Sequence, residues 1–267
     1  MKLDPALFDE DSRAHLAKWL ASEPEMETAL LFCSRQRELA ALWGAVLHEW
    51  LEACLGRSDA GVAQVKLAWW GEALAQASDQ SAHPLVRAFA GAGGQKVATP
   101  LWAALAQAAQ DLAALDALPS DPAGLLHTRR GLAQALVAVE SALWPQSDAG
   151  DADAVARSLV LWQWRHHVPG RDPQPGWLPL NLLARHGMRA TDAYARLADP
   201  AAAALFSDLA GALLEAPAAP RGPALRRART RLDGLALRRL RERRPTPFPA
   251  AGLGVLWQSW RAARGAA

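Results

Sequence analysis

The sequence predicts an all-α protein. Ala and Leu dominate an apolar fraction of 51%, and both are good helix formers. Isoleucine is absent, and Val, Thr, Tyr and Phe are scarce, so extended sheet is not expected. Proline and glycine cluster between long segments of helical periodicity, which is typical of helices joined by short breaks.

Breaks and capping residues place the helices along the chain. Asp or Ser/Thr before an apolar stretch, and Pro at its first position, mark helix starts. The segment 168–179 is predicted to be a loop, because Pro169, Pro173, Pro175 and Gly176 forbid regular helix. No linker divides the chain, so we expect a single domain over 1–267. The predicted helices cover 10–21, 24–55, 61–77, a short segment after Pro84, 100–117, 123–144, 152–167, 190–197, 200–215, 223–243 and 251–264.

Charge and cysteine content limit the partners and the compartment. The net charge is only +2, too small to indicate a polyanionic partner for the whole molecule. The segment 225–244 is locally basic, but no aromatic or polar base-reading pattern interrupts its arginines, so nucleic acid is not expected. Cys33 and Cys54 lack a Cys-x-x-Cys spacing, and no segment has an apolar signal core or span. We expect a reduced cytoplasmic protein, with a peripheral membrane location as the alternative.

Two segments resemble a known family. The stretch 66–74, KLAWWGEAL, is followed by the step His83-Pro84, and the stretch 177–187 reads WLPLNLLARHG. They resemble the double-tryptophan helix and the "YLP..LLARHG" segment of the squalene/phytoene synthase family. The helix around Leu256–Arg264 is similar to the end of bacterial members. The resemblance spans about residue 25 to the C-terminus and implies an isoprenoid-synthase-type helical bundle around a central cavity.

The acidic motifs of this family are degenerate here. Its enzymes hold Mg²⁺ with Asp-rich motifs on facing helices, because the ion prefers hard oxygen ligands. No Asp occurs between Ser12 and Asp59, where the first motif is expected. In the segment that corresponds to the second motif, Arg165 matches an Arg of the family. His166 and Gly170 occupy the positions of the family's two Asp residues. We therefore expect no cofactor, and Mg²⁺ only if an enzyme activity has been retained.

The candidate site residues follow from this comparison. The catalytic candidates are Glu49, Glu52 and His166, with Asp172 as a substitute carboxylate; His48 beside the two glutamates makes at most a weak metal site, and no metal ligands are assigned. The candidate diphosphate ligands are Arg35, Lys66 and Arg165, because guanidinium and ammonium groups suit phosphate oxygens, although ordinary surface cations explain them too. The residues expected to line the cavity are Leu42, Val46, Leu159 and Trp162, and the indole of Trp162 would fill space that a substrate needs.

Three functions remain open at this point. The first is a non-catalytic squalene/phytoene synthase-like protein, a pseudoenzyme that binds an apolar isoprenoid or lipid ligand or a protein partner. The second is a transferase of prenyl groups from prenyl diphosphates with a reorganised active site. The third is a peripheral lipid-binding module that uses the basic helix over 225–244, because such helices approach anionic headgroups.

Overall fold

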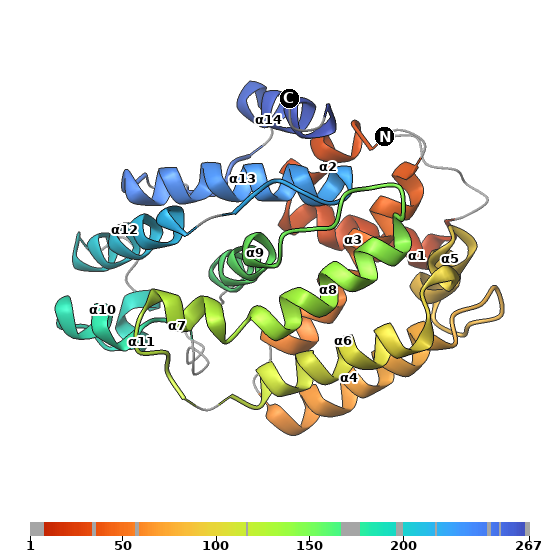
Figure 1. Ribbon diagram of the computed structural model, residues 1–267, viewed down its shortest axis with the longest axis horizontal. Coiled ribbons are helices and arrows are strands. Elements are labelled where there is room, and N and C mark those ends of the chain that lie inside the picture. Colours follow the sequence, from red (N-terminus) through yellow and green to blue (C-terminus); the bar gives the residue numbers. More distant parts are fainter. Residues whose placement is uncertain are drawn as a thin grey trace.

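Helices form all the regular structure in the described part of the chain. The computed structural model describes residues 8–33, 36–56, 59–115, 117–166, 177–195, 200–216, 218–244, 247–250 and 252–264. No strand occurs in these ranges, so the all-α prediction is confirmed. Figure 1 shows the arrangement. The helices are α1 (Glu10–Ser22), α2 (Glu25–Leu30), α3 (Arg37–Leu55), α4 (Ala60–Ala75), α5 (Pro84–Gly91), the 3₁₀ turn η2 (Gly94–Lys96), α6 (Thr99–Ala113), α7 (Pro122–His127), α8 (Arg130–Leu143), α9 (Ala152–Arg165), α10 (Leu180–Arg185), α11 (Ala190–Ala195), α12 (Pro200–Glu215), α13 (Ala224–Arg241) and α14 (Leu253–Ala263).

The single helix predicted over 24–55 is wrong, because the chain breaks between α2 and α3. The guanidinium of Arg37 donates to the carbonyl oxygens of Leu30 and Leu31, each at 3.1 Å. These carbonyls end α2 and have no partner within that helix. The hydrogen bonds from Arg37 to these carbonyls stabilise the break between the helices. No local pattern in the sequence predicts this break. The helix predicted over 123–144 is likewise two helices, α7 and α8, and α10 lies outside the predicted helix ranges.

Aspartates cap several helix starts, as the sequence predicts for three of them. Asp59 accepts from the backbone N–H of Val62 at 2.9 Å, and Asp121 accepts from that of Gly124 at 2.7 Å. Asp151 accepts from the first turn of α9 and also from the backbone N–H of Ala219 at 2.7 Å. Its carboxylate therefore joins the start of α9 to the segment before α13.

Asp9 caps α1 and ties it to α5. Its carboxylate accepts from the backbone N–H of Ser12 at 2.8 Å and pairs with Arg87 at 2.7 Å. The hydrogen bonds from Ser12, together with Arg87, lower the pKa of Asp9 to about 2.

We expect Asp9→Ala to lower the free energy of unfolding by about 1 kcal/mol at pH 7, the usual effect of losing an N-cap. The pKa of Asp9 is lower in the folded state than in the unfolded chain. The stabilisation by its carboxylate is therefore present above pH 3.8 and is lost as the pH falls towards 2. Urea unfolding at several pH values measures both effects. Asp9→Asn keeps a capping oxygen, so it should lose less than Asp9→Ala; equal stability of Asp9→Ala and wild type at pH 7 contradicts the prediction.

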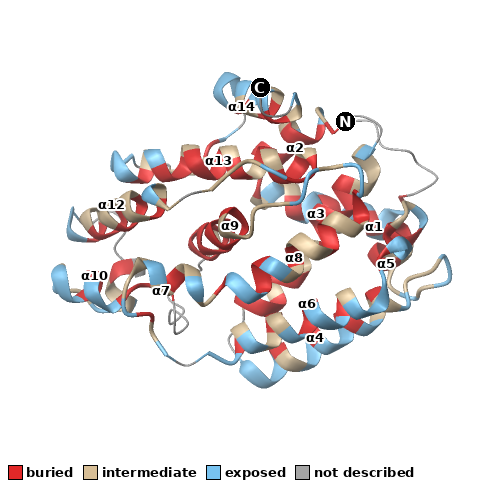
Figure 2. Ribbon diagram, in the orientation of Figure 1, coloured by how far each residue is buried: buried red, intermediate tan, exposed pale blue. Residues whose placement is uncertain are grey.

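Helix α9 forms the centre of the molecule. Figure 2 shows it enclosed by other helices and buried almost throughout, and every residue from Ala154 to Trp164 is buried. It packs against α7, α8 and α13. Its buried polar side chains have partners: Ser158 donates to Asp233, and Gln163 accepts from Arg129. The C-terminal end of α9 therefore places Trp162, Arg165 and His166 in the middle of the fold.

Two hydrophobic clusters meet at α9. The larger cluster contains most of α1 to α6 and α8, and it includes Val155, Leu159 and Trp162 of α9. The smaller one lies among α10, α12 and the C-terminal half of α13, and it includes Leu161 and Trp164. Alternate faces of one helix thus contribute to both clusters.

Within the described residues, no helix has the length and apolar content that crossing a bilayer requires.

Both cysteines are buried and carry thiol side chains. Burial raises the pKa of Cys33 to about 11, and the thiol of Cys54 donates to the carbonyl of Ala109 at 3.4 Å. Because the thiolate is the reactive species, we expect Cys33 to react with an aromatic disulfide reagent at pH 8 on the order of 100-fold more slowly than a free cysteine. Both thiols should react rapidly in denaturant. Rapid labelling of the native protein would contradict this.

Candidate functional site

A cavity lies among α1, α2, α3, α8, α9 and α13. Its apolar lining includes the side chains of Trp19, Trp43, Leu136, Trp144, Leu159 and Trp162. The cavity volume is about 60 Å³. The whole hollow, including its opening to solvent, measures about 760 Å³. Typical small-molecule pockets measure about 300–1,000 Å³. The cavity is therefore apolar and, in this shape, small.

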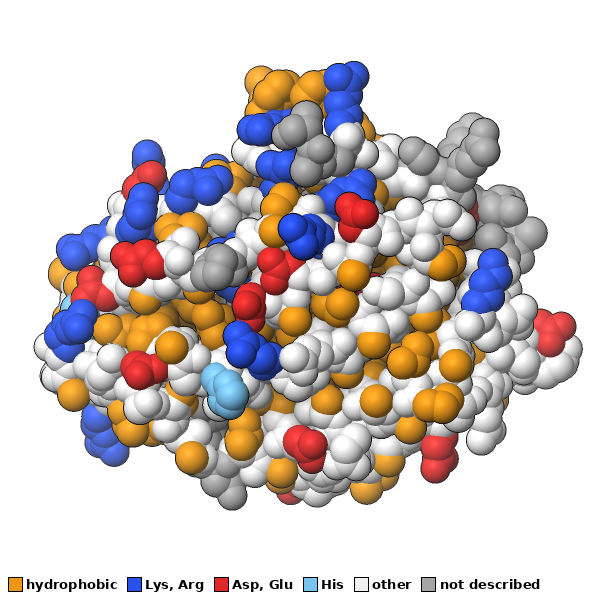
Figure 3. All heavy atoms as spheres, viewed as in Figure 1, with side chains coloured by type: hydrophobic (Ala, Val, Ile, Leu, Met, Phe, Trp, Pro, Cys, Tyr) orange, Lys and Arg blue, Asp and Glu red, His pale blue; other side chains and the backbone are white. Residues whose placement is uncertain are grey.

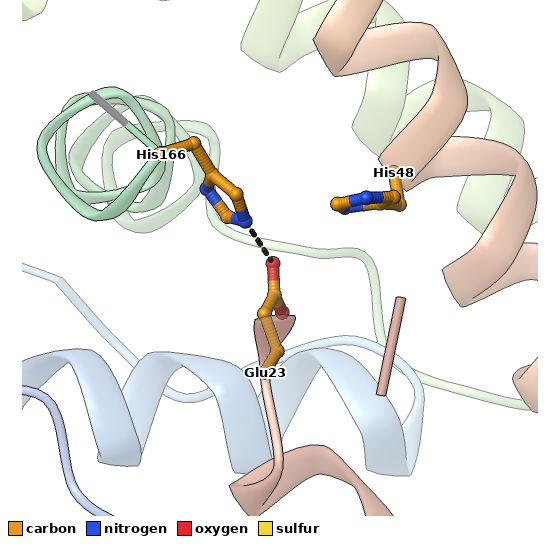
Figure 4. Close-up of side chains that lie close together, drawn as sticks. All are labelled: Glu23, His48 and His166. Atoms are coloured by element: carbon orange, nitrogen blue, oxygen red, sulfur yellow. Dashed lines mark ion pairs between the residues drawn. The ribbon is translucent and has the colours of Figure 1, made fainter. Parts of the chain in front are cut away.

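Three side chains from separate segments of the chain meet at the edge of this cavity; Glu23 and His48 line it, and His166 lies beside them. Glu23 follows α1, His48 lies in α3, and His166 ends α9 (Figure 4). One ring nitrogen of each histidine and one carboxylate oxygen of Glu23 lie within 4.8 Å of one another. Glu23 is 1% exposed and His48 is 3% exposed. This arrangement is a buried His–His–carboxylate cluster.

Hydrogen bonding fixes which nitrogen of His166 carries the proton. Its Nδ1 lies 2.9 Å from the carbonyl oxygen of Trp162, and a carbonyl only accepts, so Nδ1–H is the donor. Burial lowers the pKa of His166 to about 4, which keeps the imidazole neutral at pH 7. Its Nε2 therefore carries a lone pair, and that atom lies 3.9 Å from Glu23 Oε1. The indole of Trp162 stacks on the ring at a centroid distance of 4.1 Å.

A buried ion pair between Glu140 and Arg226 also lines the cavity. Arg226 donates from Nε and Nη2 to Glu140, with the shortest contact at 2.6 Å. The indole of Trp43 donates to the same carboxylate at 3.0 Å. Burial alone would lower the pKa of Arg226, but the attraction of Glu140 outweighs it and the net effect raises that pKa. Arg226 therefore stays charged inside the protein, and Glu140 is its salt-bridge partner.

The other carboxylates near the cavity also have partners. Glu23 Oε2 accepts from the Trp19 indole at 3.2 Å and from Arg229. Glu25 pairs with Arg165; burial raises the pKa of Glu25 even against that attraction. Asp233, on α13, accepts from the hydroxyl of Ser158. The charges of this interior are thus arranged in compensating pairs.

The two predicted catalytic glutamates face away from the cavity. Glu49 accepts from the His15 ring at 2.9 Å and from Lys18 at 3.1 Å. Glu52 accepts from Lys18 at 2.5 Å, and its other oxygen lies 3.6 Å from His48 Nε2. The two glutamates therefore join α3 to α1, and only His166 of the catalytic candidates takes part in the cluster.

The predicted diphosphate ligands do not form a common site among the described residues. Arg165 lines the cavity, but it pairs with Glu25 and lies over the Phe248 ring at 4.4 Å. Lys66 is exposed on α4, a helix that does not line the cavity. Arg35 and Asp172 lie outside the described residues.

Two of the four residues predicted to line the cavity do not line it. Leu159 and Trp162 of α9 lie at the cavity, and Trp162 occupies space there as expected. Leu42 and Val46 do not line it; both are fully buried in the core instead. The lining residues of α3 are Trp43, Gly44, Leu47, His48 and Leu51. Because α3 is buried on most sides, its apolar pattern does not reveal which face meets the cavity.

The basic helix over 225–244 is not one solvated basic face. Arg226 is buried against Glu140, and Arg229 pairs with Glu23. Arg227 donates to carbonyls of Gly222 and Ala262, so it fastens α14 to the start of α13. The exposed arginines lie in the C-terminal part, and Figure 3 shows basic side chains interspersed with acidic ones at that end of the visible face.

Sequence reasoning missed Glu23, Glu140 and Asp233. A signal existed for Glu140, which interrupts the apolar stripe of Leu136, Val139 and Leu143; a carboxylate in such a stripe needs a buried partner. Glu23, beside Pro24 at a helix end, gave no such signal. No family model matches the chain, and a search of curated proteins finds no match.

Proposed function

We propose that the protein is a non-catalytic, squalene/phytoene synthase-like protein whose central cavity binds an apolar, isoprenoid-like ligand without Mg²⁺. One observation carries the proposal. The carboxylates that line the cavity within the described residues, Glu23, Glu140 and Asp233, are all engaged by Arg or Ser side chains. The remaining lining is mainly tryptophan and aliphatic side chains.

The donor set does not fit Mg²⁺ with a diphosphate. Such sites usually combine one or two carboxylates with substrate phosphates around an octahedral ion. To serve as a ligand, Glu140 would have to leave Arg226, and an uncompensated buried charge costs about 3–5 kcal/mol. Trp19 and Arg229 hold Glu23 Oε2, so Glu23 offers only Oε1, beside two imidazoles that Mg²⁺ does not prefer. The glutamates Glu49 and Glu52 point to α1. No catalytic step through Mg²⁺ is therefore assigned.

The lining does fit an apolar molecule. Ligand pockets are mostly apolar with a few convergent polar groups, and Glu23 and His48 of the His–His–Glu cluster line this cavity. Its present size is too small for a chain of fifteen carbons, so such a ligand requires the Trp162 side chain to turn aside. Trp162 thus limits what the cavity accepts.

We expect Trp162→Leu to bind farnesol at least fivefold more tightly than wild type, because a smaller apolar side chain enlarges the cavity. Quenching of tryptophan fluorescence during a farnesol titration measures the dissociation constant, with isothermal titration as an independent readout. Trp69→Leu is the matched control, since Trp69 is 45% exposed on α4 and should leave the affinity unchanged.

The proposal also predicts that Mg²⁺ has no effect on farnesol binding. Wild type should bind farnesol with the same affinity in EDTA and in Mg²⁺. Failure of both wild type and Trp162→Leu to bind farnesol, with folding confirmed by circular dichroism, contradicts the apolar-ligand function.

A further inference from the structure

We propose that Glu23, His48 and His166 form a binding site for one divalent first-row transition-metal ion, of the zinc or ferrous type. Two imidazoles and one carboxylate are a donor set that such ions use. It differs from the oxygen-only set that Mg²⁺ and Ca²⁺ prefer. The inference does not depend on the apolar ligand proposed above.

The first argument is that two lone pairs face each other across a gap. The Nδ1–H of His166 already donates to the Trp162 carbonyl, and its Nε2 lies 3.9 Å from Glu23 Oε1, beyond hydrogen-bond distance. A protonated imidazole would be drawn to the carboxylate at roughly 2.7–2.9 Å. Nε2 is also buried without a hydrogen-bond partner. Two acceptors that face each other in a buried site leave a place for a cation.

The second argument comes from His48. Its side chain is almost fully buried in α3, its Nδ1 has no hydrogen-bond partner, and its Nε2 lies 3.6 Å from Glu52 Oε1. A buried nitrogen without a partner is costly. Figure 4 shows the ring directed toward Glu23 and His166, so a metal bond would satisfy this imidazole too.

The surroundings already hold the ligands in place. The N–H of His166 Nδ1 donates to the Trp162 carbonyl, the kind of second contact that orients metal-bound histidines. The Trp19 indole and Arg229 both bind Glu23 Oε2, which leaves Oε1 toward the gap. Each contact restricts the rotation of a ligand before any ion arrives.

The distances require only a small closure. Metal bonds of 2.0–2.2 Å in a tetrahedral site separate ligand atoms by roughly 3.4 Å. The Glu23–His166 pair at 3.9 Å must close by roughly half an ångström. The widest pair lies within 4.8 Å and must close by on the order of 1 Å. With three protein ligands, a fourth position would be left for water or for a polar ligand group.

The test is a titration of zinc into the full chain after EDTA treatment and dialysis, in competition with a chromophoric chelator. We expect one ion per chain, and a visible absorption spectrum of bound, nitrogen-coordinated Co²⁺ when cobalt replaces zinc. His48→Leu and His166→Leu should each weaken zinc binding at least tenfold. The matched control is His186→Leu, because His186 pairs with Asp208 at 3.0 Å outside the cluster; it should keep the wild-type affinity.

A second measurement covers variants that fold poorly. Zinc at 100 times its dissociation constant should raise the melting temperature of wild type and of His186→Leu, because it binds only the folded state. It should not raise that of His48→Leu or His166→Leu. Absence of stoichiometric zinc binding by wild type, or equal binding by all three variants, overturns the site.

Discussion

Glu140→Gln is expected to lower the free energy of unfolding by about 3–5 kcal/mol, the cost of breaking a buried ion pair from one side. Glu140 is 2% exposed and accepts from Arg226 and from the Trp43 indole. Glutamine keeps the shape of the side chain but removes its charge. The Arg226 guanidinium is then left buried without a counter-charge.

Chemical denaturation of Glu140→Gln measures this loss. The exposed Glu72→Gln on α4 is the matched control, and it should change stability by less than about 0.5 kcal/mol. The double variant Glu140→Gln with Arg226→Met removes both charges, so it should lose less than Glu140→Gln alone. A loss below about 1 kcal/mol for Glu140→Gln would show that the pair is solvated in solution.

Gly44→Ala is expected to cost about 2 kcal/mol of stability, although alanine is the better helix former. A Cβ on Gly44 would overlap the six-membered ring of Trp19, and that indole is 2% exposed in the core. Its displacement also disturbs the hydrogen bond from Trp19 to Glu23 at 3.2 Å. We therefore expect lower stability together with a weakened site around Glu23.

Gly131→Ala is the control for this substitution. Gly131 lies in α8, and an added Cβ there meets nothing within 4 Å. The same change should raise stability by about 0.5–1 kcal/mol, because it removes only the backbone freedom of glycine. Denaturation curves of the two variants should therefore shift in opposite directions. A shift of both in the stabilising direction would mean that Trp19 does not pack on Gly44.

Local signals in the sequence were sufficient for the helices and many of their boundaries. Asp59, Asp121 and Asp151 cap helices where the sequence predicts them, because a cap depends only on neighbours three residues away. The break before Arg37 was not predictable in the same way. It depends on a long side chain that reaches back to Leu30 and Leu31.

The candidate site depends on pairings between distant segments. His166 was a candidate from its place in the sequence, but its neighbours Glu23 and His48 come from the other end of the chain. Glu140 of α8 and Arg226 of α13 likewise come together only in the folded chain. The face of α3 was misassigned for a related reason: Leu42 and Leu47 are both apolar, and only tertiary packing places one in the core and the other at the cavity.

Isothermal titration of farnesyl diphosphate, with Mg²⁺ and with EDTA, followed by product analysis of the same mixtures, tests the central claim most directly. The cavity carboxylates are committed to Arg and Ser partners, so the account predicts equal heats in the two buffers and neither released diphosphate nor a coupled thirty-carbon product. Binding that requires Mg²⁺ and ends in released diphosphate would contradict it, and would mean that these ion pairs open to make a catalytic site.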